Sequence, residues 1–230
     1  GIAMKVLGIN SSPRGSESST LRLVKSALDG AQSSGADVEF VDLCRFNIEY
    51  CNACGVCYKT GRCPKKDDFQ SIYEKMLAAD GLVMGSPNYI RSVTAQMKTL
   101  LDRMADAIHC QLFAGKYSIT VATSGSLGHD QHVLEYMNEV MLTLGSYVTG
   151  NAGASMAAGP EALADAGKRA FQLGESLTED IRTKKSYYKQ EPILIENRKY
   201  FQNLVEMYKD EWVHQYEYWK TWRECPDKKC

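Results

Sequence analysis

Four cysteines lie in one short stretch with the spacing Cys-x2-Cys-x2-Cys-x5-Cys: Cys51, Cys54, Cys57 and Cys63. Thiolates this close can converge on one metal centre from a single irregular loop, and Gly55 and Gly61 relax the backbone between them. The first three cysteines have a spacing typical of cuboidal iron–sulfur clusters, and Pro64 follows the last one as in bacterial ferredoxin runs. We therefore expect an iron–sulfur cluster here before any other group.

Two alternatives to a cluster remain open at this point. Four thiolates can hold zinc tetrahedrally, although structural zinc usually draws its cysteine pairs from separate turns. The thiols can also stay reduced and carry no metal. In a reducing compartment, the chain's eight cysteines favour metal ligands or free thiols over disulfides. Cys44 and Cys110 are expected to be structural, and no metal is expected at Cys225 and Cys230 near the C-terminus.

A second candidate site is the hydroxyl-rich loop 10–20, between an apolar run and an amphipathic segment that begins at Leu21. The start of a helix offers unpaired N–H groups and the positive end of its dipole, which together attract anions. Arg14 adds a planar cation suited to phosphate. The hydroxyl donors are Ser12, Ser18, Ser19 and Thr20.

The type of phosphate follows from what this loop lacks. It matches neither the dinucleotide Gly-x-Gly-x-x-Gly pattern nor a Walker loop with Gly-Lys-Ser/Thr. A hydroxyl-rich loop without lysine suits a terminal monophosphate that is not transferred, such as the one that FMN carries. A polar loop with a serine helix cap is the plainer alternative.

Two further loops follow apolar runs and could bound a flat heteroaromatic ring. The first contains Ser86, Pro87, Asn88, Tyr89 and Ile90, and the second contains Thr123, Ser124, Gly125 and Ser126. Both can present backbone N–H groups, and such donors near a flavin ring help to set its potential. Taken singly, each is an ordinary connection. Three such loops on one edge make coincidence a weaker explanation.

The elements that must position these loops alternate along the chain. The expected strands are 5–9, 38–41, 81–85, 116–123 and 147–152, and the expected helices begin near residues 21, 69, 94, 133 and 161. This alternation predicts an α/β fold with a doubly wound, five-stranded parallel sheet and helices on both faces. Ligands of such folds bind at the carboxyl ends of the strands, where all three loops are expected.

The C-terminal part differs from the rest in composition. Residues 183–230 hold ten of the 22 aromatic residues and all three tryptophans, so we expect an FMN-binding unit at 4–182 and an aromatic helical extension at 183–230. An apolar stripe spaced by three or four residues predicts one long helix in this extension. Its members are Phe201, Leu204, Val205, Tyr208, Trp212, Tyr216 and Trp219.

Charge and hydropathy exclude some classes of protein. The net charge of −1 gives no sign of a nucleic-acid binder. No run of about 18 apolar residues is present, so no membrane span is expected. The N-terminus lacks the layout of a signal peptide, and a cytoplasmic location is the expectation by default.

The motifs resemble those of a known family. Ser12-Pro13-Arg14, Ser86-Pro87-Asn88-Tyr89 and Lys98 through Asp102-Arg103 are similar to the NADPH-dependent FMN reductase group of flavodoxin-like proteins. The cysteine loop followed by Asp67-Asp68 narrows the resemblance to the iron–sulfur flavoproteins of anaerobic archaea and bacteria. The likeness covers residues 4–182. It implies a flavodoxin-like fold and a homodimer or homotetramer with FMN held near a subunit interface.

The resemblance also implies roles for individual residues. Ser12, Arg14, Ser18, Ser19 and Thr20 would bind the phosphate; Pro87, Asn88, Tyr89 and Ile90 would contact the ring system; Thr123, Ser124, Gly125 and Ser126 would bound its pyrimidine side. The four cysteines of the loop would ligate a [4Fe-4S] cluster. This cluster would exchange electrons with FMN, either within one subunit or across the interface between subunits. Apart from the resemblance, His129 and His132 are expected near the ring, where a proton-transfer role is the alternative to the commoner surface or capping role. Asp102 and Arg103 are expected to form helix-surface ion pairs.

The expected function is that of an FMN-dependent oxidoreductase whose cluster passes electrons between FMN and a carrier such as ferredoxin. No side chain need act as acid or base, because the flavin carries the chemistry. The first alternative is an NAD(P)H-dependent FMN or quinone reductase without a cluster. The second, ranked lower, is a zinc-stabilised interaction module whose aromatic tail binds a protein.

Overall fold

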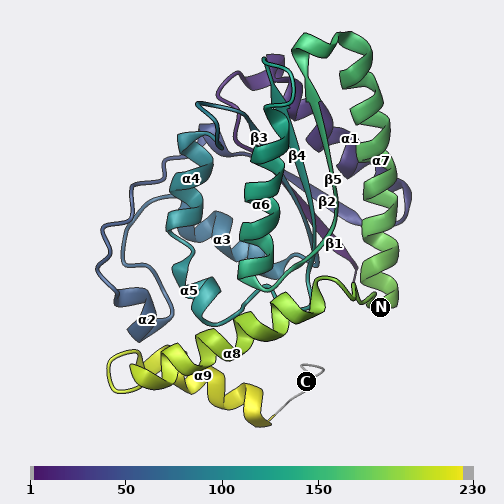
Figure 1. The fold of residues 1–230 in the computed structure, drawn as a ribbon. Coiled ribbons are helices and arrows are strands. Elements are labelled where there is room, and N and C mark those ends of the chain that lie inside the picture. The colour runs from purple at the N-terminus through teal and green to yellow at the C-terminus, as the bar shows by residue number, and fades with distance from the viewer. Residues whose placement is uncertain (1–2, 225–230) are drawn as a thin grey trace.

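The architecture is a five-stranded parallel sheet between two layers of helices, seen in a computed structural model that describes residues 3–224, with side chains to residue 222 (Figure 1). The strands are β1 Lys5–Asn10, β2 Asp37–Asp42, β3 Gly81–Pro87, β4 Tyr117–Ser124 and β5 Tyr147–Ser155. Their order is β2-β1-β3-β4-β5, and every pairing is parallel. The predicted flavodoxin-like α/β fold is confirmed.

Burial follows the position of each strand in the sheet. All eight residues of β4 are buried, as expected for a central parallel strand that is covered on both faces. Edge strand β2 is only partly covered and has one fully buried residue, Val41. Because the strands are parallel, the loops after the central strands lie along one edge of the sheet, where a ligand can be held.

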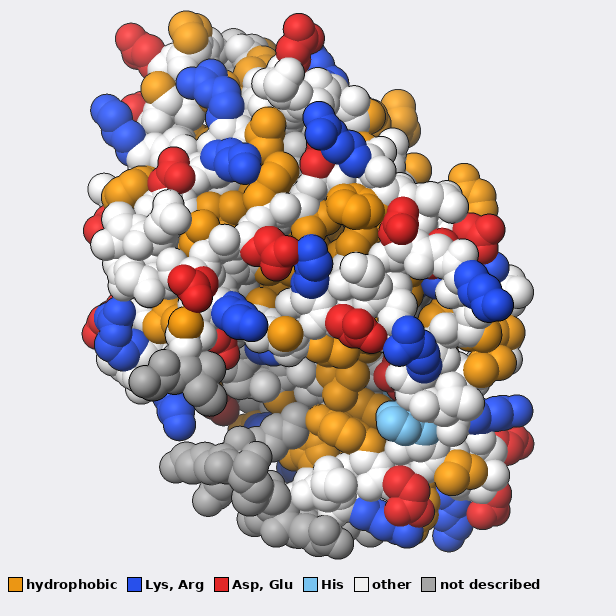
Figure 2. All heavy atoms as spheres, turned by 180° about the vertical axis from the view of Figure 1, so that it is seen from behind, with side chains coloured by type: hydrophobic (Ala, Val, Ile, Leu, Met, Phe, Trp, Pro, Cys, Tyr) orange, Lys and Arg blue, Asp and Glu red, His pale blue; other side chains and the backbone are white. Residues whose placement is uncertain are grey.

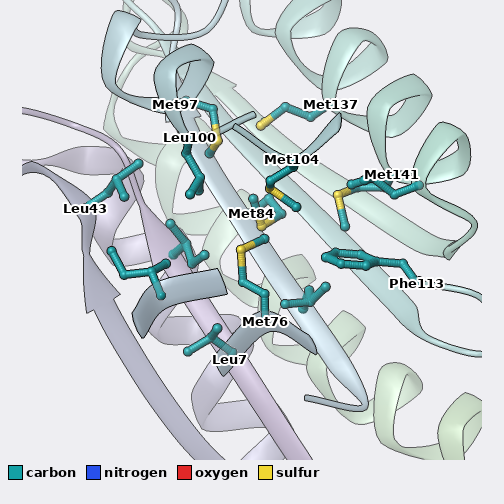
Figure 3. Close-up of a cluster of buried hydrophobic side chains, with 14 of the residues drawn as sticks. Leu7, Leu43, Met76, Met84, Met97, Leu100, Met104, Phe113, Met137 and Met141 are labelled. Atoms are coloured by element: carbon teal, nitrogen blue, oxygen red, sulfur yellow. The ribbon is translucent and has the colours of Figure 1, made fainter. Parts of the chain in front are cut away.

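Helices cover both faces of the sheet. On one face lie α1 Ser19–Ser33 and α7 Pro160–Thr183, and on the other lie α3 Phe69–Ala78, α4 Ala95–Asp102, α5 Ala105–His109 and α6 Asp130–Leu144. Short segments complete this part: η1 Gly15–Glu17, η2 Leu43–Arg45, α2 Val56–Thr60 and η3 Met156–Ala158. The core under α3, α4 and α6 is rich in methionine, with Met84, Met104 and Met141 near Phe113 (Figure 3). Flexible methionine side chains fill irregular gaps between helices and sheet.

The helix expected to begin near residue 94 is interrupted. Thr94 caps α4 by accepting a hydrogen bond from the N–H of Met97, but α4 ends at Asp102 and α5 begins at Ala105. The break falls at Arg103 and Met104, which are both buried. Turning the chain here places Arg103 in the protein interior rather than on a helix surface.

The single long helix expected in the tail is wrong. The tail forms two helices, α8 Glu191–Met207 and α9 Val213–Glu224, which fold back on each other as a hairpin (Figure 1). Tyr208 leaves the helical conformation, and its carbonyl oxygen accepts hydrogen bonds from the N–H groups of Glu211 and Trp212. The spacing of three or four residues continues through this turn, so periodicity alone could not reveal the break.

Within residues 3–224, no helix has both the length and the apolar character needed to cross a membrane. The division into 4–182 and 183–230 stays a prediction. Cys225 and Cys230 lie outside the described residues.

Candidate flavin and cysteine sites

The three predicted flavin loops meet at one edge of the sheet. Because β1, β3 and β4 are parallel neighbours, their carboxyl ends lie side by side. Thr20 and Thr123 join the first and third loops through their hydroxyl groups, 2.7 Å apart. The N–H of Asn88 donates to the carbonyl of Thr123 at 2.7 Å, which ties the second loop to the third. The sheet therefore brings the expected phosphate and ring loops together.

The expected phosphate loop wraps around the start of α1. Ser18 caps the helix, with its Oγ accepting from the N–H of Leu21 at 3.0 Å, and Ser19 begins the first turn. That turn offers N–H groups with no partner inside the helix. Ser12 is buried and Arg14 is exposed beside it, free to reach an anion. Oδ1 of Asn10, at the end of β1, is buried with no partner among the described residues, as expected of an acceptor that a ligand hydroxyl would satisfy.

The Tyr89–Ser92 segment forms a tight turn with an unusual backbone. Tyr89 and Ser92 exchange both backbone hydrogen bonds, and Ile90 and Arg91 between them have φ values of 46° and 66°. Positive φ at both central residues defines a type I′ turn, which normally takes Asn and Gly. A β-branched isoleucine in this region is strained, and such strain gathers at functional sites. The turn is therefore built to present Tyr89 and Ile90 outward.

Large apolar side chains are exposed along this edge. Ile90 is 95% exposed, Leu127 71% and Tyr89 43%, and Met156 is also exposed. All four lie in loops that follow β3, β4 and β5. A flat apolar ring resting on them would remove this surface from water, which a folded chain alone leaves exposed.

The third loop is held by a buried carboxylate that the sequence did not reveal. Asp130, in the first turn of α6, accepts a hydrogen bond from the hydroxyl of Ser155 at 2.8 Å, and Ser155 accepts one from the N–H of Gly128. Ser124 also contacts Ser155 and donates to the carbonyl of Ser126 at 2.7 Å. These bonds fix the loop from Ser124 to Gly128 before any ligand arrives.

His132 contacts the second loop through a ring nitrogen. Its Nε2 is 3.2 Å from Oδ1 of Asn88, and its ring lies 5.7 Å from that of His129. His132 can therefore orient the Asn88 amide through this hydrogen bond. The signal in the sequence was only its position in the first turn of the helix after the third loop.

These observations fit FMN in four respects. The start of α1 offers N–H and hydroxyl donors suited to a phosphate. The buried Asn10 oxygen has no partner within the described residues, and the exposed apolar side chains lie on the same edge. A Cβ added at the exposed Gly125 would meet no heavy atom of the described residues within 4 Å, so space remains open there.

The four cysteines of the loop face a common small cavity. Cys51, Cys54, Cys57 and Cys63 all line a cavity of about 40 Å³, together with Tyr58 and Arg103. Cys51 and Cys54 are exposed, while Cys57 and Cys63 are partly buried. Left-handed backbone at Ala53, Gly55 and Gly61 folds the loop around this cavity. The structure thus brings all four predicted ligands together.

A buried ion pair closes the base of the cysteine loop. Asp67 accepts hydrogen bonds from Nη1 of Arg103 at 2.7 Å and from the N–H of Glu49 at 2.8 Å. The side chains of Arg103 and Asp67 are 1% and 0% exposed, so the surface pairing expected for Arg103 is wrong. Burial alone would raise the pKa of Asp67, but the hydrogen bonds from Arg103, Glu49 and Phe69 outweigh it and lower that pKa. Nη2 of Arg103 also donates to Sγ of Cys63 at 3.1 Å.

The thiols of this loop require a cation if they are to ionise together. Burial, followed by the charge of Asp106 and of the other three cysteines, raises the pKa of Cys57 to about 12. Bound metal ions reverse this effect, because a coordinating thiol is deprotonated outright. Among residues 3–222, no three His, Cys, Asp or Glu side chains are grouped as ligands of one metal ion.

The two sites lie in different parts of the folded chain. The flavin loops follow the carboxyl ends of the strands at the top of Figure 1, whereas α2, which carries Cys57, lies at the lower left beside the turn between α8 and α9. A separate cavity of about 540 Å³, lined by Tyr117, Lys184 and Arg198, lies at the amino ends of the strands. It is on the edge opposite to the flavin loops and contains none of the predicted site residues.

The fold and the edge loops define a flavodoxin-like flavoprotein. The chain matches the sequence model described as NADPH-dependent FMN reductase over residues 4–161, and it belongs to that family. It is therefore an FMN-dependent oxidoreductase. The family predicted from the Ser-Pro-Arg, Ser-Pro-Asn-Tyr and cysteine motifs is confirmed.

Individual relatives narrow the likeness. The chain is 33% identical to an iron–sulfur flavoprotein of Archaeoglobus fulgidus over 94% of its own length and 98% of the relative. It is 43% identical to the iron–sulfur flavoprotein MJ1083 of Methanocaldococcus jannaschii over 44% of its length and 51% of the relative. Among solved structures, an NAD(P)H:quinone oxidoreductase from Methanothermobacter marburgensis has a TM-score of 0.62 at 20% identity, covering 76% of this chain and 98% of that one. That structural likeness supports the fold.

Proposed function

We propose that the protein is a two-centre electron carrier, with FMN along the carboxyl edge of the sheet and a [4Fe-4S] cluster on Cys51, Cys54, Cys57 and Cys63. The observation that carries this proposal is the placement of all four thiols around one cavity in a chain whose three flavin loops are hydrogen-bonded together. The names of its iron–sulfur flavoprotein relatives support it further. When bound, the two groups supply the electron-transfer chemistry.

The residues of the edge would then divide the work of holding FMN. Ser12, Ser18 and Ser19 surround the start of α1 and bind the phosphate together with Arg14. Thr20 is turned toward Thr123, so its hydroxyl braces the two loops as well as facing the site. The ring contacts come from the second loop, with Pro87, Asn88, Tyr89 and Ile90. The third loop borders the pyrimidine side of the ring and offers backbone donors from Thr123, Ser124, Gly125 and Ser126.

A cluster is favoured over zinc by the arrangement of the thiols. The four cysteines come from one short loop and surround one cavity, whereas structural zinc usually draws its cysteine pairs from separate turns. The spacing of the first three cysteines is also typical of cuboidal clusters. Arg103 donates a hydrogen bond to Sγ of Cys63, and this bond would stabilise a negatively charged thiolate there.

We propose that the protein assembles as a homodimer or homotetramer, and the positions of the two sites support this. In one chain, α2 lies away from the carboxyl edge of the sheet (Figure 1). Electron exchange between the centres then calls for a second copy that brings its cysteine loop to this copy's flavin edge. Closed symmetric assemblies are the commonest way for soluble chains to make such a contact. Partners of the assembly would be small redox carriers such as ferredoxin.

A nucleic-acid partner is not proposed. Figure 2 shows Lys and Arg side chains interspersed with Asp and Glu over the described part of the back face, in keeping with the net charge of −1. Proteins that bind nucleic acid gather positive charge on one face.

The test is an anaerobic absorption spectrum of the purified protein, with flavin, iron, sulfide and zinc assays on the same sample. Flavin bands with about four iron and four sulfide per chain are expected. Flavin without iron or sulfide would reject the cluster and leave an NAD(P)H-dependent FMN or quinone reductase. Faster bleaching of the flavin by reduced ferredoxin than by NADPH is expected; the reverse order would favour that reductase. One zinc per chain without flavin would reject both.

Arg14 provides the first specific prediction. Replacing Arg14 with alanine should raise the dissociation constant of FMN roughly 10- to 100-fold, because a hydrogen bond to a charged group is worth about 1.5–3 kcal/mol. Affinities are measured by fluorescence titration of flavin-free protein with FMN and, in parallel, with riboflavin. The loss should be confined to FMN, since riboflavin lacks the phosphate.

Arg182 offers a matched control for Arg14. It is exposed at the C-terminal end of α7, where it pairs with Glu179, and its removal changes the net charge equally. Arg182→Ala should leave both affinities unchanged. Equal FMN affinity in the Arg14→Ala and Arg182→Ala variants would remove Arg14 from the phosphate site.

A further inference from the structure

The aromatic tail packs directly against the cysteine loop. The ring of Tyr58, next to Cys57 in α2, lies 4.9 Å from that of Trp212 and 4.6 Å from that of His109. Trp212 lies 4.9 Å from His109 and is stacked at 4.4 Å on Tyr208. Tyr58 also lines the cavity that the four cysteines surround. The tail therefore contacts a residue, Tyr58, that itself lines the cavity of the four thiols.

A second contact joins α9 to the end of α2. His214 lies so close to Gly61 that a Cβ there would be 2.4 Å from the imidazole. Gly61 has a φ of 77°, which glycine adopts without strain. Glycine at this position thus allows the positive φ and leaves room for His214 to lie close to the backbone.

Polar contacts fix α9 in this position. Gln215 is fully buried, and its Nε2 donates to Oδ1 of Asp106 at 2.7 Å while its Oε1 is 3.0 Å from Nδ1 of His109. Nε1 of Trp219 donates to the carbonyl of His109 at 2.9 Å. Asp106 and His109 belong to α5, whose first residue, Ala105, lines the cysteine cavity. A buried glutamine with both ends bonded defines one docking position for α9.

We infer that the tail hairpin, α8 and α9, is the outer wall of the metal site, and that Trp212 and His214 hold the α2 side of the cysteine loop closed against solvent. This inference rests on the proposed function for the metal, but the covering of Cys57 does not. Trp212 and His214 act as positioning residues through Tyr58 and Gly61. They touch the loop, not the thiols.

Two consequences follow for a cluster held behind this wall. Removing the ring of Trp212 makes opening of the loop easier, because it removes three aromatic pairs, one of them with Tyr58 in α2. Iron should then be lost to a chelator roughly tenfold faster. A cluster on four thiolates is an anion that becomes more negative on reduction, and low-polarity surroundings disfavour that change. Opening to water should therefore shift the cluster's potential in the positive direction.

The experiment compares the full-length protein with Trp212→Ala, Trp212→Phe and His214→Ala variants. Three quantities are measured: the anaerobic rate of iron loss to a ferrous chelator, the midpoint potential followed by electron paramagnetic resonance, and the alkylation rate of Cys57 by iodoacetamide after iron removal. Trp212→Ala and His214→Ala should accelerate iron loss and alkylation, and shift the potential upward. In Trp212→Phe the rates and the potential should stay close to those of the wild type, since this variant keeps an aromatic ring against Tyr58.

The matched control is Tyr188→Ala. Tyr188 belongs to the same aromatic tail but is 80% exposed, and its described ring contact is with Lys189. This variant should behave as the wild type does. Flavin content and circular dichroism should be the same in all variants, which separates opening of the loop from failure to fold.

The outcomes separate this inference from the proposed function. Wild-type protein without iron or sulfide would contradict the proposed cluster, while faster alkylation of Cys57 in the Trp212→Ala and His214→Ala variants would still support the wall. Wild-type protein with a cluster, and equal rates and potentials in Trp212→Ala, His214→Ala and Tyr188→Ala, would overturn the wall and leave the proposed function intact.

Discussion

Replacing Arg103 with methionine is expected to lower the free energy of unfolding by about 3–5 kcal/mol. The Arg103 and Asp67 side chains are almost fully buried, so the variant leaves the Asp67 carboxylate in the interior without its cation. Glu49 and Cys63 lose hydrogen-bond donors as well. Urea unfolding followed by circular dichroism under anaerobic conditions measures the loss.

Lys98→Met is the matched control for this prediction. Lys98 pairs with Asp102 one turn before Arg103, but both side chains are about half exposed. Exposed pairs contribute about 0–1 kcal/mol, so this variant should change stability little. The double variant Arg103→Met/Asp67→Leu should recover much of the loss, because it removes the stranded charge. Equal losses in the Arg103→Met and Lys98→Met variants would contradict the buried pair.

The effect of Arg103→Met should depend on pH in one direction. The net lowering of the pKa of Asp67 in the folded protein means that its pairing contributes stability above the unfolded value of about 4. That contribution disappears as pH falls through the lowered folded pKa. The difference between wild type and variant should thus be constant from about pH 5 to 8 and shrink below about pH 4.

The sequence was sufficient for features that depend on local patterns. Short apolar runs alternating with helical spacing predicted all five strands. The signal is clearest in β1, β3 and β4, because parallel strands that are covered on both faces are buried along almost their whole length. The positions of the three flavin loops followed from the rule that parallel strands end at one edge. The cysteine spacing predicted a loop whose four thiols face one cavity, since these residues are close in the chain.

Features that depend on distant contacts were not accessible in this way. Arg103 looks like any charged residue at a helix end, and its burial is set by Asp67, which lies 36 residues earlier. Asp130 and Ser155 are 25 residues apart, and neither forms a motif. The left-handed Ile90 contradicts the turn preferences of its residue type. Each of these residues breaks a local rule beside one of the two candidate sites, where such departures are expected.

The tail shows why a correct pattern can give a wrong element. The apolar stripe from Phe201 to Trp219 is real, and Val205 and Trp219 are buried as it predicts. The stripe faces two different surfaces, however, because the chain reverses at Tyr208. α8 packs on α5 and α6, whereas α9 packs on α2 and bonds to α5. The same periodicity therefore serves core packing and the cover of the cysteine loop.

The second prediction of large effect concerns the glycines of α7. Replacing Gly174 with alanine is expected to destabilise the protein by at least about 2 kcal/mol. A Cβ at Gly174 would lie 2.1 Å from the carbonyl oxygen of Ala27 and 2.7 Å from the backbone nitrogen of Ala31 in α1. Backbone atoms cannot move aside as a flexible side chain can, so the two helices must separate.

Gly167 provides the control within the same helix. A Cβ there would meet only Oγ of Ser26, at an ordinary distance of 3.6 Å. Alanine is a better helix former than glycine by about 1 kcal/mol, so Gly167→Ala should be neutral or slightly stabilising. The opposite signs expected for two identical substitutions in one helix rule out helix propensity as the cause of the loss. Both values come from thermal and urea unfolding of the flavin-free protein.

The same substitution should reach the flavin site through α1. The first turn of α1 carries the phosphate loop, and Val24 and Thr20 lie against Gly85 of β3, where a Cβ would be 2.5 Å from Val24. Moving α1 away from the sheet displaces this turn from its neighbours at the strand ends. FMN affinity should therefore fall in Gly174→Ala and stay unchanged in Gly167→Ala, as measured by fluorescence titration. Wild-type stability and FMN affinity in Gly174→Ala would show that α1 and α7 do not pack this closely.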